Sequence, residues 1–323
     1  MTRWPLILLA CSIAVGALAQ DGATTWPDRP IRLIVPFPAG SSTDIVSRVL
    51  AQKLASKLGQ QVVIENRAGA SGNIGAETVA KAAPDGYTIG IATASTHAVA
   101  ASLNGSLAYD PLKDFAPVGP IGSQPYVLVV YPGMPVHSVP ELIALAKAKP
   151  GTLDYGSAGM ASLAQLATAL FAGMAGIEIT HVPYKSSSQS MTDMITGRLD
   201  MQFATIAPSL PNIRAGQLRA LATTGIKRVK ILPEIPTVAE SGMPDYEAVL
   251  WMSLVAPAAT PGAVIARLNG ELNTVLDSSE GKEALLAQGM ESEPGPPEAL
   301  TQRIRADIEK WRAVADKAGI RAE

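Results

Sequence analysis

Short runs of β-branched and other apolar residues alternate along the chain with alanine-rich segments whose apolar positions recur at helical spacing. Residues 31–35 are almost continuously apolar, which predicts a buried strand. Residues 43–58 carry apolar side chains three and four positions apart, which predicts a helix, and Gly59 follows as its C-cap. Because this order of strand and helix recurs, the pattern predicts an α/β fold with parallel sheets and helices on both faces.

The remaining elements follow from the same two periodicities. Further strands are predicted at residues 61–65, 88–92, 126–131, 153–156, 179–182, 201–204, 218–223 and 246–256. Further helices are predicted at residues 74–83, 139–148, 162–175, 187–196, 261–276 and 297–317.

Two candidate crossovers, at residues 122–125 and 244–251, divide the chain so that its first and last parts share one lobe. The middle of the chain then forms a second lobe, joined to the first by a two-strand hinge. We expect each lobe to be a mostly parallel sheet flanked by helices. The predicted boundaries are residues 20–124 and 251–323 for lobe 1 and residues 125–250 for lobe 2.

The first residues have the pattern of an export signal. Arg3 supplies a positive charge, residues 4–17 are almost wholly apolar, and Ala17-Leu18-Ala19 has the small-x-small pattern of a cleavage site. A buried N-terminal helix is disfavoured, because it would need an amphipathic stripe and this stretch is apolar on every face. We therefore expect a signal peptide at residues 1–19, cleavage near Ala19 and a periplasmic mature protein.

The only cysteine of the chain, Cys11, lies within this predicted signal peptide. Leu9-Ala10-Cys11 resembles a lipoprotein cleavage box, but the short stretch before it leaves little room for an apolar region. Soluble release is therefore favoured over a lipid anchor. We expect a mature chain without thiol or disulfide, stabilised by its hydrophobic core.

Composition narrows the class of ligand. The formal net charge is −2 and no long run of like charges occurs, which is not typical of a nucleic-acid or membrane-surface binder. Aromatic residues make up only 5% of the chain, which disfavours an aromatic-lined sugar site. No cluster of His, Cys, Asp and Glu has the spacing of metal ligands, so we expect neither a metal nor a cofactor.

Small, hydroxyl-rich loops follow four of the predicted strands, at residues 36–44, 92–96, 156–162 and 183–188. Ligands of open parallel sheets bind beyond the carboxyl ends of the strands, where helix N-termini converge. Backbone N–H groups and hydroxyls in such loops can bind an anion without a buried arginine. The candidate ligand-binding residues are Phe37, Ala39, Gly40, Ser41, Ser42, Thr43, Asp44, Thr93, Ala94, Ser95, Ser157, Ala158, Gly159, Met160, Ser162, Tyr184, Lys185, Ala204 and Thr205.

Each of these residues also has a purely structural interpretation, since Ser, Thr, Gly and Asp are common helix caps and turn formers. Asp44 either contacts the ligand or interacts with the dipole of its helix and pairs with Arg48, four residues later. Lys185 is the only cation among the candidates, and it either reaches the ligand or lies in solvent.

Several segments, in a fixed order, carry a resemblance to a known family. They are WPDRPIR at 26–32, VPFPAG at 35–40 followed by Thr43-Asp44, ENRAGASGNIG at 65–75, APDGYT at 83–88, YGSAG at 155–159, HVPYK at 181–185 and LPEIPTVAESG at 232–242. Over nearly the whole mature chain, the sequence resembles the substrate receptors of tripartite tricarboxylate transporters, also called Bordetella uptake gene products or the Bug family. Ser41 and Ser186 stand where members of this family often carry glycine, and each adds a hydroxyl.

The resemblance implies a two-lobed Venus-flytrap fold of the periplasmic-binding-protein type. It also implies a receptor that captures a small organic carboxylate, either a di- or tricarboxylate or an aromatic acid, and delivers it to the membrane components of the transporter. We expect a monomer that catalyses no reaction.

Three alternatives stay beside this interpretation. A ligand-sensing partner of a membrane sensor kinase would need the same closing lobes. An exported α/β hydrolase would need a histidine oriented by a carboxylate, and neither this constellation nor a G-x-S-x-G motif is visible in the sequence. Residues 69–75 read G-x-x-G-x-x-G, which is not the spacing of a dinucleotide-binding fingerprint.

Overall fold

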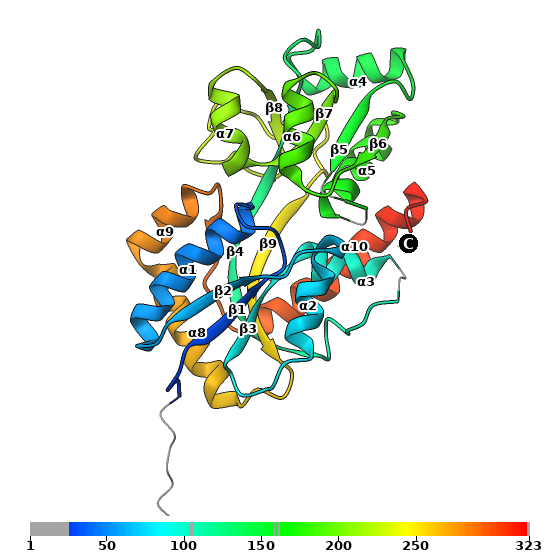
Figure 1. Cartoon of the computed structure of the whole chain (residues 1–323). Helices are drawn as coiled ribbons and strands as arrows, with labels where there is room; N and C mark the ends of the chain where they lie inside the picture. The colour runs from blue at the N-terminus through cyan, green and yellow to red at the C-terminus, as the bar shows by residue number, and fades with distance from the viewer. Residues whose placement is uncertain (1–25, 104–105, 158, 161, 322–323) are drawn as a thin grey trace, which may run out of the picture.

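The computed structural model describes residues 26–103, 106–157, 159–160 and 162–321. The predicted signal peptide and its cleavage site lie outside these residues. The chain forms two lobes. The strand β4 (Phe115–Val130) runs from one lobe into the other, and β9 (Val249–Pro257) begins beside it where the lobes meet (Figure 1). The predicted two-lobed α/β fold is confirmed.

Lobe 1 is built on three parallel strands in the order β2-β1-β3, which are β1 (Ile31–Val35), β2 (Val62–Asn66) and β3 (Thr88–Thr93). β9 and β4 extend this sheet in antiparallel pairing, and β10 (Glu291–Ser292) pairs with β4. The helices of this lobe are α1 (Ser42–Leu58), α2 (Asn73–Ala80), α8 (Gly262–Asp277) and α9 (Ser279–Leu286).

The continuous apolar pattern of β1 has a direct structural cause. Leu33 belongs to the core cluster formed with α1, α8 and α9, while its neighbour Ile34 belongs to the cluster that contains Ala76 and Val79 of α2. Because successive side chains of a strand point to opposite faces, a strand covered on both faces needs apolar residues at successive positions. β1 is therefore held at the centre of lobe 1, and the loop that follows it is placed at the edge facing lobe 2 (Figure 1).

Lobe 2 has the strand order β4-β7-β5-β6, in which β5 (Asp154–Ser157) is parallel to both β6 (Thr180–Pro183) and β7 (Met201–Thr205). β4 is antiparallel to β7 and to β8 (Arg219–Thr223). The helices of this lobe are α4 (Val139–Ala148), α5 (Leu163–Ala175), α6 (Ser187–Ile195) and α7 (Ile206–Arg214).

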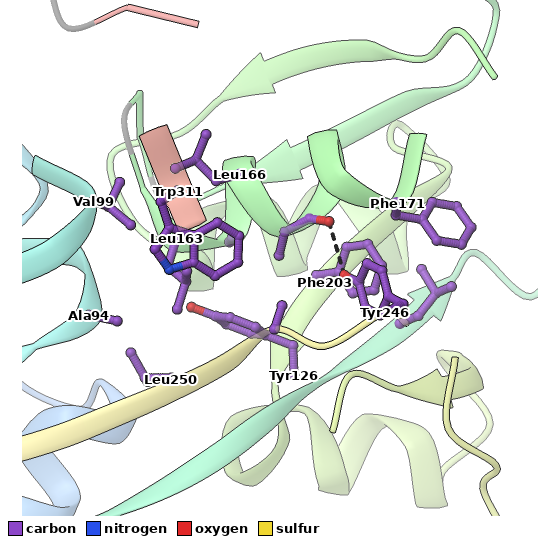
Figure 2. Close-up of a cluster of buried hydrophobic side chains, with 14 of the residues drawn as sticks. Ala94, Val99, Tyr126, Leu163, Leu166, Phe171, Phe203, Tyr246, Leu250 and Trp311 are labelled. Atoms are coloured by element: carbon purple, nitrogen blue, oxygen red, sulfur yellow. Dashed lines mark hydrogen bonds between the residues drawn. The ribbon is translucent and has the colours of Figure 1, made fainter. Parts of the chain in front are cut away.

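The last helix, α10 (Glu298–Ala318), packs against both lobes. It contacts the helical segments η2 (Ser95–Val99) and α3 (Ala100–Ser102) of lobe 1 as well as α5 of lobe 2. Trp311, which is 1% exposed, lies beside Leu163 and Tyr126 in a core cluster shared by the lobes (Figure 2). α10 therefore supports the side of the molecule along which the crossing strands run.

Several parts of the chain differ from the sequence prediction. The helix α9 and the short strand β10 were not predicted, and two further differences have a clear local cause. β4 begins at Phe115 instead of residue 126, because register shifts around Gly119 and Gly122 let a proline-rich segment pair with β9. The helix α7 was not predicted, since Pro208 and Pro211 within it are usual helix breakers. By contrast, the predicted helix at residues 139–148 has the same bounds in the structure.

Within the described part of the chain, no helix is long and apolar enough to cross a bilayer.

Candidate ligand-binding site between the lobes

The loop that follows β1 leads into a capped helix at the edge of lobe 1. Ser41 has an extended backbone, and its hydroxyl accepts a hydrogen bond from the backbone N–H of Asp44 at 3.2 Å. Ser42 and Thr43 are buried in the first turn, where the helix dipole and free N–H groups favour an anion. The hydroxyl of Ser42 accepts a hydrogen bond from Gln124 of β4 at 2.9 Å.

Thr43 is only 4% exposed. Its backbone carbonyl accepts a hydrogen bond from Ser47, but among the residues that the structure describes, its hydroxyl makes no hydrogen bond. A hydroxyl at this place can donate to a ligand without breaking an existing contact.

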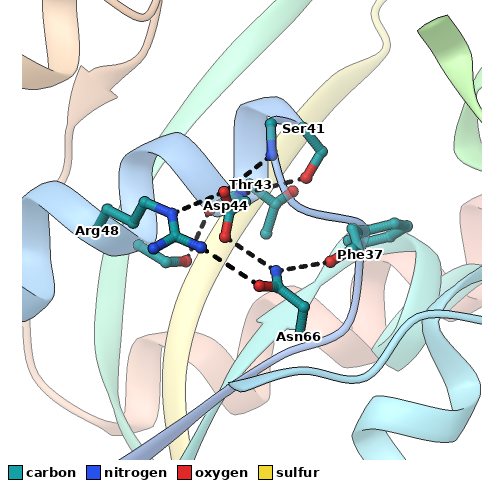
Figure 3. A network of polar contacts seen from close by, with 8 residues as sticks. Phe37, Ser41, Thr43, Asp44, Arg48 and Asn66 are labelled. Atoms are coloured by element: carbon teal, nitrogen blue, oxygen red, sulfur yellow. Dashed lines mark hydrogen bonds and ion pairs between the residues drawn. The ribbon is translucent and has the colours of Figure 1, made fainter. Parts of the chain in front are cut away.

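Asp44 belongs to a polar network within lobe 1 (Figure 3). One carboxylate oxygen accepts hydrogen bonds from the Gly40 N–H and from Arg48 Nε, both at 2.9 Å, and the other accepts from Asn66 Nδ2 at 2.9 Å. Burial by itself raises the pKa of Asp44, but the hydrogen bonds from Arg48, Asn66 and Gly40 outweigh it and lower that pKa below 3.8. Asp44 was predicted either to contact the ligand or to pair with Arg48. The structure contains the ion pair with Arg48, at 2.9 Å.

The network also fixes the loop that precedes α1. Asn66 Nδ2 donates to the Phe37 carbonyl at 2.9 Å as well as to Asp44 (Figure 3). Phe37 is half-buried, and Ala39 and Gly40 are exposed at the turn. Asp44 and Asn66 thus position the loop before α1, whose backbone was predicted from the sequence to contact a ligand.

The end of β3 is fully buried. Thr93 and Thr96 hydrogen-bond to each other, and the Thr96 hydroxyl also contacts His97 Nδ1 at 2.9 Å. Ala94 and Ser95 are 0% and 5% exposed, and the Ser95 hydroxyl accepts a hydrogen bond from the Leu163 N–H of lobe 2 at 3.4 Å. Ser95 therefore lies where the two lobes meet.

Ser157, at the end of β5, is held by a chain of polar contacts. Its hydroxyl lies 2.9 Å from the Gly159 carbonyl and 2.7 Å from His181 Nε2, and Gln165 Nε2 lies 3.3 Å from His181 Nδ1. Burial lowers the pKa of His181 below 6.5, which favours the neutral ring. With Gln165 donating to Nδ1, the ring donates from Nε2 to Ser157, and Ser157 donates to Gly159.

This direction of hydrogen bonding bears on the hydrolase alternative. A general base must accept the proton of the nucleophile, whereas here Ser157 donates its proton to a carbonyl. Across the described residues, no carboxylate is hydrogen-bonded to His181. The contacts thus favour a role for Ser157 and His181 in positioning the loop around Gly159.

A second contact between the lobes involves a turn that the sequence did not assign to the site. Ser71 donates from its hydroxyl to the Met160 carbonyl at 2.7 Å. Ser71 belongs to a run of positive φ angles, +133° at Gly69, +46° at Ala70, +55° at Ser71 and +97° at Gly72. Non-glycine residues rarely adopt such angles, and such strained residues cluster at functional sites. In the sequence, the two glycines on either side of Ala70-Ser71 were the feature that could have indicated this turn.

The other candidates of lobe 2 differ in their surroundings. Tyr184 donates from its backbone to the Ser157 carbonyl at 3.0 Å and from its hydroxyl to Asp193 at 2.8 Å, and burial together with Asp193 raises its pKa to about 12. Ser162 caps α5 by accepting from the Gln165 N–H at 3.3 Å. Lys185 is exposed and, within the described ranges, makes no ion pair. Ala158 lies outside the described residues.

Ala204 and Thr205 lie at the end of β7. Ala204 is 1% exposed and packs in the lobe 2 core with Val127 and Met191, so its side chain is engaged by apolar neighbours. Thr205 precedes α7, and its carbonyl accepts a hydrogen bond from Ser209 at 2.7 Å.

Taken together, the contacts bring the loops after β1, β3 and β5 to the facing edges of the two lobes. Their donors are mostly neutral, and the nearby guanidinium of Arg48 is already paired with Asp44. Among the residues that the structure describes, no group of three or more His, Cys, Asp or Glu side chains could hold a metal ion. This arrangement suits recognition of an anion by hydrogen bonds.

Comparison with known proteins identifies the family. Residues 46–320 match the family described as tripartite tricarboxylate transporter family receptor. The chain belongs to this family. The predicted resemblance is confirmed.

Two proteins of similar sequence cover nearly the whole chain. The chain is 38% identical to Protein BugT of Bordetella pertussis over 320 residues, covering 99% of this chain and 98% of that protein. It is 36% identical over 305 residues to a protein encoded in the tcbD-tcbE intergenic region of Pseudomonas sp., covering 94% of this chain and 90% of that protein.

Solved structures of similar proteins have the same fold. R. palustris Rpa4515, solved with adipate, is 40% identical with a TM-score of 0.88, and the match covers 92% of this chain and 99% of that one. MatC from Rhodopseudomonas palustris, solved with bound malate, is 30% identical with a TM-score of 0.82, covering 90% of this chain and 99% of that one.

Proposed function

We propose that this receptor captures a small organic carboxylate between its lobes and delivers it to the membrane components of a tripartite tricarboxylate transporter. The observation that carries the proposal is the hydroxyl of Thr43, which lies in the first turn of α1 and makes no hydrogen bond among the described residues. That end of α1 faces lobe 2 (Figure 1). A helix N-terminus with a free hydroxyl donor favours a carboxylate through both its dipole and its hydrogen bonds.

The comparisons support a dicarboxylate as the first ligand to test. Two similar receptors were solved with adipate and with malate, and both ligands carry two carboxylates. In this chain, the capped helix α1 of lobe 1 and the loop after β5 of lobe 2 offer a set of donors on each side. One carboxylate would bind at α1, and the other end of the ligand would contact lobe 2, which couples binding to closure. Tricarboxylates and aromatic acids remain within the same ligand class.

Titration calorimetry and thermal unfolding test this function. Adipate or malate should bind with one ligand per chain and stabilise the folded state by about 2.7 kcal/mol at a hundredfold excess over Kd. The diamide of adipate is the matched control, since it keeps the length but loses both charges, and it should bind much more weakly. Absence of heat and of stabilisation with every mono-, di- and tricarboxylate and aromatic acid would contradict the proposal.

Several further properties belong to the same proposal. We propose that the lobes are divided within one or two residues of the predicted boundaries at 124–125 and 250–251, that the chain acts as a periplasmic monomer after removal of residues 1–19, and that it releases its ligand chemically unchanged. Mass spectrometry of the secreted protein and proton NMR of the recovered ligand test the last two points. A chain that retains Met1, or a ligand converted in a reaction abolished by Ser157→Ala, would contradict them.

A further inference from the structure

The two strands that connect the lobes form a fork. β4 and β9 are paired with each other in lobe 1 up to the partners Pro125 and Val249. Beyond this point β4 continues into lobe 2, where it pairs with β7 and β8, while the chain before Val249 leaves β4. The sheet of lobe 1 therefore ends and that of lobe 2 begins between Pro125 and Tyr126.

Thr224 lies within this fork and is 0% exposed. Its backbone N–H donates to the Tyr126 carbonyl at 2.9 Å, and its carbonyl accepts from the Ala248 N–H at 2.9 Å. Its hydroxyl accepts from the Tyr126 N–H at 2.7 Å and donates to the Ala248 carbonyl at 2.5 Å. One residue thus joins both branches by its backbone and again by its side chain.

The hydroxyl is essential to the second connection. Bridging an N–H on one branch and a carbonyl on the other requires a group that accepts and donates at once, which a Ser or Thr hydroxyl does and an aliphatic side chain cannot. The site is also buried, because Tyr126 and Ala248 are 6% and 0% exposed. Without the hydroxyl, a buried N–H and a buried carbonyl would each lose a partner.

We propose that Thr224 is a positioning residue of the hinge, a clamp whose hydroxyl holds the fork closed and so fixes the point about which the lobes turn. The inference rests on the proposed receptor function in one respect, that the lobes open and close around a ligand. With the fork closed, bending is confined to the peptides at 125–126 and 248–249. With the fork open, the lobes sample a wider range of orientations before any ligand binds.

Distances between the lobes in the full-length protein without ligand test the clamp. Spin labels are attached at Lys57→Cys in α1 and Lys147→Cys in α4, both exposed positions in different lobes, in a chain that carries Cys11→Ser. We expect Thr224→Val and Thr224→Ala to broaden the distance distribution, since loss of such a buried network shifts a conformational population by roughly tenfold. Thr224→Ser, which keeps the hydroxyl, should restore the original width.

The adjacent Thr223 provides a matched control. It is also 0% exposed, and its hydroxyl has no hydrogen-bond partner within the described residues, so Thr223→Val makes the same change without breaking a contact. The clamp is wrong if Thr224→Ala, shown to be folded by its cooperative thermal transition, keeps the original width, or if Thr223→Val broadens it equally. Because the experiment uses no ligand, it decides the clamp even where adipate and malate fail to bind and the proposed function fails.

Discussion

At the scale of single residues, the candidate site separates polar groups that already have hydrogen-bond partners from a donor that is still available. Asp44 is bound by Arg48 and Asn66, whereas the Thr43 hydroxyl has no partner in the described part of the protein. Thr43→Val removes this donor while nearly preserving shape, so we expect affinity for adipate or malate to fall about tenfold to a hundredfold in titration calorimetry. Lys185→Met should change affinity little, because Lys185 is exposed. Unchanged binding in Thr43→Val with abolished binding in Lys185→Met would mean that a cation anchors the ligand.

At the scale of elements, the turn η1 (Ala70–Gly72) of lobe 1 contacts lobe 2 through one hydrogen bond. Its left-handed backbone directs the Ser71 hydroxyl to the Met160 carbonyl, a contact that forms only when the lobes meet. Ser71→Ala removes one neutral hydrogen bond from the closed state, so we expect release of adipate or malate to accelerate roughly fivefold in stopped-flow experiments. Ser56→Ala is the control, since that hydroxyl contacts only its own helix at Gln52. Equal release rates in the two variants would show that the turn does not hold the closed state.

At the scale of the whole molecule, stability depends on a histidine in the core between the sheet and α10. His97 is 1% exposed, lies 4.5 Å from the Phe115 ring centre, and has a pKa lowered to about 3 by burial. The unfolded chain binds a proton near pH 6.5, so stability is fully present above that pH and falls as the pH drops toward 3. Urea unfolding at pH 7.5 and pH 5 should show this loss as a lower free energy of unfolding at pH 5. His97→Gln should reduce the slope of that free energy against pH. His137→Gln, at an exposed position, should leave the slope unchanged. A slope unaffected by His97→Gln would exclude His97 as its cause.

Much of the local structure was predictable from the sequence. The helix α1 and its C-cap Gly59 follow from apolar spacing and from the left-handed backbone that glycine readily adopts. That the loops after β1, β3 and β5 lie at the edges of their sheets was also predictable, because a parallel sheet presents the carboxyl ends of its strands at one edge; their contact with a ligand stays a prediction. These are short-range properties, and neighbouring residues are enough to determine them.

Only the tertiary structure decided which partner each polar group meets. Hydrogen bonds join Asp44 to Asn66, Ser71 to Met160 and Ser157 to His181, and Thr224 bonds to both Tyr126 and Ala248. The partners are separated by 22 to 98 residues along the chain. The first part of β4 was not predicted from the sequence for the same reason. Its prolines and glycines form a strand only because β9 lies beside them. Hydrogen bonds of this kind depend on distances set by the packing of both lobes, and neither local propensity nor apolar periodicity carries information about those distances.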